Sequence, residues 1–150
     1  MLMINGFCHL YSATEQHIAK IREIKTIGFV DSNELSKVTN RAVQLCVLDL
    51  LLAAHRNKHE TTINKLPGAK ALHHKLLMKY NWPLSEIRAM SLSDVFIALH
   101  DELSLESLEG QAKTYFSSLL AGAYPMAFDD FIDEEWDPNL SDRLLFDSKE

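Results

Sequence analysis

The chain has 150 residues, of which 47% are hydrophobic and 24% are charged, a composition typical of a globular protein and unlike that of a disordered or fibrous one. A domain of this size buries roughly 70% of the surface that its unfolded chain exposes, so we expect one helical domain over residues 1–150 that needs no disulfide or metal to fold. The formal net charge of −6 argues against nucleic acid as a partner, because attraction to phosphate dominates that kind of binding.

Neither a secretory leader nor a membrane span is predicted. Residues 1–11 lack a basic start, and polar residues interrupt their apolar character. The most hydrophobic stretch, residues 43–54, would extend only about 18 Å as a helix, well short of the roughly 30 Å hydrocarbon core. Cys8 and Cys46 match no metal-ligand spacing and are expected to be free thiols. We therefore expect a cytoplasmic protein with no membrane partner.

Helix signals recur along the first half of the chain. Residues 12–15 have the form of a capping box and predict a helix that ends near Gly28, while a short strand is tolerated only at residues 4–11. A second capping box at residues 31–34 opens a long helix, predicted over residues 33–57. This helix becomes almost wholly apolar, so we expect it to lie at the centre of the fold.

Shorter helices are predicted in the second half. Residues 67–68 mark the start of a helix that Asn81-Trp82-Pro83 ends, since proline cannot continue a helix. Further helices are predicted over residues 85–90, 93–103 and 108–121. The sequence thus predicts an all-α fold, a single irregular bundle of about six helices around the central apolar helix.

One stretch carries a loose family resemblance. The 18 residues from Trp82 to Leu99 resemble short helix–turn–helix segments of small phage tail-assembly proteins. The resemblance implies a role in assembly, which is one of the alternatives considered below.

No motif for catalysis or nucleotide binding occurs: GxSxG, a Walker glycine loop, GxGxxG and HExxH are all missing. His55 and His59 are four residues apart, a spacing that can clamp a metal on one helix face. Arg56 and Lys58 disfavour a cation there, so we interpret these histidines as a solvated helix end. The sequence predicts no catalytic residue, no metal site and no cofactor.

Charge is divided unequally along the chain. Residues 1–80 contain eleven lysines and arginines against six acidic residues, whereas residues 81–150 contain four against fifteen. Three interpretations are open: the halves neutralise each other across the fold, the acidic half meets a basic partner, or the basic half touches nucleic acid. We do not expect the third, because the basic residues are scattered and the total charge is negative.

An acidic–aromatic segment, residues 128–138, interleaves six carboxylates with three aromatic side chains. Aromatic side chains anchor binding hot spots, and carboxylates steer basic partners. We predict these partner-binding residues: Asp129, Asp130, Phe131, Asp133, Glu134, Glu135, Trp136 and Asp137. The apolar spacing also suits a final amphipathic helix with its aromatics inward. The C-terminal stretch, residues 126–150, is expected to be partly extended.

Our leading functional hypothesis is a non-catalytic protein-binding domain, of inhibitor or immunity type, whose acidic C-terminal half contacts a basic protein. The alternative is an assembly protein of a phage or mobile element that associates with itself through helix faces. A third hypothesis is a small metal-dependent hydrolase that uses His55, His59 or His100.

Overall fold

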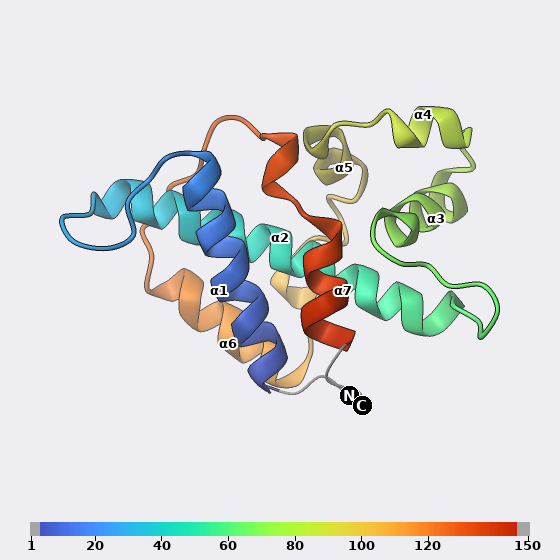
Figure 1. Ribbon diagram of the computed structural model, residues 1–150, viewed down its shortest axis with the longest axis horizontal. Coiled ribbons are helices and arrows are strands. Elements are labelled where there is room, and N and C mark those ends of the chain that lie inside the picture. The colour runs from blue at the N-terminus through green and yellow to red at the C-terminus, as the bar shows by residue number, and fades with distance from the viewer. Residues whose placement is uncertain (1–3, 147–150) are drawn as a thin grey trace.

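The protein is an all-α bundle, as the sequence predicts. The computed structural model describes residues 4–146, and these form seven α-helices, two 3-10 turns and no strand (Figure 1). In chain order the elements are α1 (Ile4–Ile21), α2 (Ser32–His59), α3 (Ala69–Tyr80), α4 (Leu84–Arg88), α5 (Leu92–Ala98), η1 (Leu105–Ser107), α6 (Gly110–Ala121), η2 (Asp133–Glu135) and α7 (Pro138–Phe146).

Helix α2 is the centre of the fold, which confirms the prediction. Its N-cap is Asp31, whose carboxylate accepts hydrogen bonds from the backbone N–H groups of Asn33 and Glu34 at 2.8 and 3.4 Å. Helices α1, α3, α6 and α7 all pack against α2 (Figure 1). Several of its side chains are completely buried, including Leu45 and Leu48, because neighbours cover it on several sides.

Helix α1 differs from the prediction at both ends. It begins at Ile4, so residues 4–11 are helical and neither the strand nor the helix start at Ser12 is correct. Phe7, Leu10 and Ile18 share its buried face, and this packing outweighs the local capping signal. The helix ends at Ile21, ahead of Gly28, because Glu23 takes the left-handed conformation (φ 56°) that terminates it.

The second half agrees with the predicted helices only in part: the helix predicted over residues 93–103 ends at Ala98, and α7 was not predicted. Asn81, in the left-handed conformation, ends α3 just before Pro83. Helix α5 is capped by Ser91, which accepts from the N–H of Asp94 at 3.2 Å, and therefore begins slightly earlier than predicted. Within the described part of the chain, no helix is both long enough and apolar enough to cross a membrane. Residues 147–150 of the predicted extended C-terminal stretch lie outside the described residues.

Candidate functional site

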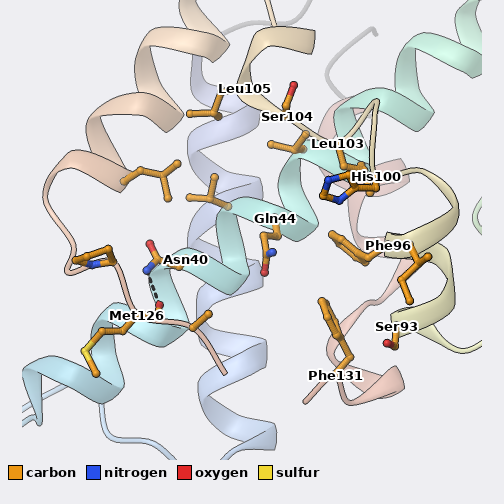
Figure 2. A pocket seen from close by; sticks show the side chains of 16 residues that line it. Asn40, Gln44, Ser93, Phe96, His100, Leu103, Ser104, Leu105, Met126 and Phe131 are labelled. Carbon is orange, nitrogen blue, oxygen red and sulfur yellow. Dashed lines mark hydrogen bonds between the residues drawn. The ribbon is translucent and has the colours of Figure 1, made fainter. Parts of the chain in front are cut away.

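The candidate site is a groove of about 600 Å³ that opens between α2, α5, η1, the end of α6 and residues 125–131 (Figure 2). None of its sixteen lining side chains is an acid, a lysine or an arginine. They are Asn40, Val43, Gln44, Val47, Ser93, Phe96, Ile97, His100, Leu103, Ser104, Leu105, Leu120, Pro125, Met126, Ala127 and Phe131. A cavity of this size and apolar character is typical of a binding site.

Two aromatic rings form one wall of the groove. Phe96 from α5 and Phe131 from the acidic–aromatic segment stack with their centroids 5.0 Å apart. Across the groove, the side-chain amide of Asn40 donates to the carbonyl oxygens of Tyr124 and Met126, at 2.8 and 2.6 Å, and holds the opposite edge (Figure 2). Both edges are thereby fixed to neighbouring elements.

Two arginines contact aromatic rings of the acidic–aromatic segment, and one of these rings, Phe131, belongs to the groove wall. The Arg41 guanidinium lies 3.9 Å from the Phe131 ring centroid, and the Arg22 guanidinium lies 3.8 Å from that of Phe128. Each guanidinium thus lies against an aromatic ring, an arrangement that cation–π attraction stabilises. Arg22, just after α1, and Arg41, on α2, thus connect distant parts of the chain to the acidic–aromatic segment that carries Phe131.

A buried carboxylate joins these arginines. Glu135 accepts from Arg22 Nη2 at 2.6 Å, from Arg41 Nη1 at 3.2 Å and from the N–H of Ile132 at 3.0 Å. Arg22 also pairs with Asp130 at 3.0 Å, and this hydrogen bond lowers the pKa of the Asp130 carboxyl. The side chains of Glu135 and Arg41 are 0% and 2% exposed, so their charges compensate each other away from water.

The amphipathic helix considered for residues 128–136 does not form; only η2 is helical there. The carbonyl oxygens of Phe128 and Asp130 accept from Arg41 and Arg22 at 3.3 and 3.0 Å, in place of helical N–H partners. The arginines therefore hold this backbone in an irregular conformation.

The eight predicted partner-binding residues divide into two groups. Phe131 lines the groove, while Asp129, Asp130, Asp133 and Glu134 are exposed. The other three serve the fold: Glu135 is buried, Trp136 Nε1 donates to Asp49 Oδ1 at 2.8 Å, and Asp137 accepts from the N–H of Asn139 at 3.0 Å. Arg22 and Arg41 carried no sequence signal that linked them to this segment.

Four exposed carboxylates lie next to groove residues along the chain, and one of them, Asp94, lines an adjoining cavity that shares Ile97 with the groove. Asp94, Asp101, Glu106 and Asp129 each lie one or two residues along the chain from a side chain that lines the groove, and we call these four the acidic rim. Asp101 and Glu106 pair with Lys79 and Lys113 at 2.8 and 3.0 Å. Among residues 4–146, Asp94 and Asp129 pair with no cation. The rim therefore keeps carboxylates available to a positively charged partner.

The histidines of α2 are less solvated than expected. His55 is only 8% exposed, and its Nε2 lies 2.8 Å from Nδ1 of His74 on α3. Burial, and then the nearby His59, Lys75 and His74, lower the pKa of His55 to about 4. In the described part of the chain, no group of three or more His, Cys, Asp or Glu side chains is placed to hold a metal ion.

His100 and Cys46, two other side chains with catalytic potential, lie in different environments. His100 lines the groove, whereas Cys46 is buried in α2. Burial raises the pKa of the Cys46 thiol and so disfavours the nucleophilic thiolate.

Fold and groove together define a class, an all-α bundle with an apolar surface groove. They define no particular family, since no family model, curated protein or solved structure matches the chain.

Proposed function

We propose that the chain is a non-catalytic protein-binding domain whose groove receives an amphipathic helical segment of a basic protein. An inhibitor or immunity-type factor acts in this way, by covering a functional surface of its partner. The observation that carries the proposal is the pairing of an apolar groove with the acidic rim.

The apolar lining supports insertion of side chains from a helix. A helix that binds in a groove presents anchors at spacings of three and four residues, and a volume of about 600 Å³ accommodates several of them. Ile97, on the groove lining, is 72% exposed, which leaves apolar area for a partner to cover. The stacked Phe96 and Phe131 rings offer the rigid aromatic contact found at binding hot spots.

The charge of the surroundings supports a basic partner. Carboxylates of the acidic rim attract lysines and arginines on the polar face of an incoming helix, and they repel an acidic one. Residues 81–150 contain more acidic than basic side chains, and those acids that pair with no cation of the first half add to this attraction.

Two labelled helical peptides of about 15 residues test the proposal. Both carry leucines at the same positions, but one has lysine and the other glutamate at the remaining positions. Fluorescence anisotropy is expected to show binding of the lysine peptide only, weakening when salt rises from about 50 to about 300 mM because ions screen the acidic rim. The double variant Asp94→Asn/Asp129→Asn is expected to weaken the same binding. It leaves the buried Glu135 unchanged.

A matched pair of variants locates the interaction. Ile97→Lys places a charge on the groove, and we expect it to reduce affinity for the lysine peptide by about tenfold or more. Ile63→Lys makes the same change at a residue that is 95% exposed between α2 and α3, and is expected to have little effect. Equal losses in both variants, or equal binding of the two peptides, would refute the proposal.

A further inference from the structure

A second concave site lies against α3 and α4. These two helices lie on the side of the molecule away from α6 (Figure 1). This cavity, of about 320 Å³, lies between α3, α4 and the loop that joins α2 to α3. All of its charged lining residues, Lys65, Lys70 and Arg88, are basic, and we call it the basic pocket. In a protein with a net charge of −6, a cavity lined by one sign of charge concentrates the opposite sign of ligand.

The cations of the basic pocket are largely available. In the described part of the chain, neither Lys70 nor Arg88 forms an ion pair, and both are exposed. Lys65 approaches Glu60 at 3.7 Å, but the other oxygen of that carboxylate accepts from the N–H of Leu66 at 2.8 Å. No aspartate or glutamate is among the residues that line this cavity.

The three cations supply the positive charge of the pocket, and a histidine adds a hydrogen-bonding group. The dipole of helix α3 is already compensated, because the Asp142 carboxylate accepts from the N–H of its N-cap, Gly68, at 2.6 Å. His73 also lines the pocket, and its pKa is lowered by burial and then by the charge of Arg88. A neutral His73 offers a hydrogen bond to an anion without adding a charge of its own.

The shape and lining restrict the kind of anion. The volume is at the small end for ligand sites, and Leu66 and Leu77 supply apolar surface beside the cations. A long polyanion such as nucleic acid is disfavoured, because the net charge of the whole protein is negative. A small molecule with a doubly charged anionic group and an apolar portion can bind the cations and contact the leucines at the same time.

We propose that the basic pocket binds a small organic phosphate monoester, with the phosphate held by Lys70 and Arg88 and the organic portion against Leu66 and Leu77. Lysine and arginine are the side chains that proteins use for phosphate, since charge-assisted hydrogen bonds are roughly twice as strong as neutral ones. This site is separate from the groove and does not depend on the function proposed for it.

Isothermal titration calorimetry with phenyl phosphate and with inorganic phosphate tests the proposal. Phenyl phosphate is expected to bind about tenfold more tightly, because its ring contacts the leucines. The double variant Lys70→Gln/Arg88→Gln is expected to lose about tenfold or more in affinity. Both residues are exposed, so thermal melting is expected to match that of the native chain.

The control variant Lys20→Gln/Lys25→Gln removes two exposed cations from another part of the molecule and is expected to bind phenyl phosphate normally. Equal affinity for the two phosphates would overturn the assignment of an organic ligand. Absence of binding, or equal losses in the two double variants, would overturn the site itself. Ile97→Lys is expected to leave the phosphate affinity unchanged, which separates this result from the groove.

Discussion

Replacing Glu135 with glutamine is expected to lower the free energy of unfolding by about 3 kcal/mol, because it leaves a buried arginine without its counter-charge. The Arg41 side chain is 2% exposed and would then be near Arg22 with no carboxylate between them. Urea denaturation measures the loss. The same change is expected to weaken peptide binding in the groove, since Phe131 is held in place by the segment that Glu135 anchors.

The neighbouring residue provides the control. Glu134 is exposed, and Glu134→Gln removes one carboxylate without uncovering a buried charge. We expect its effect on stability to stay within about 0.5 kcal/mol. If the two variants unfold at the same urea concentration, the buried arginine–carboxylate cluster does not stabilise the fold.

Replacing Asp49 with asparagine is expected to change how stability depends on pH. Asp49 is fully buried, and burial raises its pKa from 3.8 to about 7. Between these values the folded protein keeps a proton that the unfolded chain releases. The free energy of unfolding therefore falls as pH rises from about 4 to about 7, by ~4 kcal/mol from this residue alone. Asparagine removes this contribution and can still accept from Trp136.

The contribution of His55 has the opposite sign. Its pKa falls from 6.5 in the unfolded chain to about 4, so in this interval the unfolded chain binds the additional proton. Stability from His55 is therefore lost as pH falls from about 6.5 to about 4. The Asp49→Asn variant lacks the opposing contribution of Asp49. Its free energy of unfolding is therefore expected to rise as pH rises from about 4 to about 6.5.

Urea denaturation of the native chain and Asp49→Asn between about pH 4 and pH 8 checks this prediction. The quantity to compare is the difference in unfolding free energy at each pH, because asparagine also changes the local hydrogen bonds. We expect the unfolding free energy of Asp49→Asn, relative to that of the native chain, to increase as pH rises to about 7. A difference that stays constant across the range would show that Asp49 ionises as it does in water.

Local capping and turn signals in the sequence predict the positions of several helices. Asp31 caps α2 as its spacing predicts, and Asn81 with Pro83 separates α3 from α4. The continuous apolar run predicted that α2 is central. The start of α1 was wrong because the capping box at residues 12–15 has the correct composition, while tertiary burial of Phe7 and Leu10 extends the helix through it.

The groove wall was not predictable from local sequence. The spacing of Phe128, Phe131 and Trp136 indicated a helix, but long-range contacts with Arg22 and Arg41 determine the backbone. Sequence composition predicted an acidic–aromatic interaction surface, and it could not distinguish the buried Glu135 from the exposed Glu134 beside it. That distinction depends on where two distant arginines lie in the folded chain.

The most direct test of the proposed function is a two-dimensional nitrogen–proton NMR titration of the isotope-labelled protein with the lysine peptide. We expect the largest backbone amide shifts at residues that line the groove, among them Phe96, Ile97 and Phe131. The glutamate peptide is expected to leave these signals in place. Shifts confined to α3 and α4, or no shifts at all with the lysine peptide, would contradict the assignment of the groove as the protein-binding site.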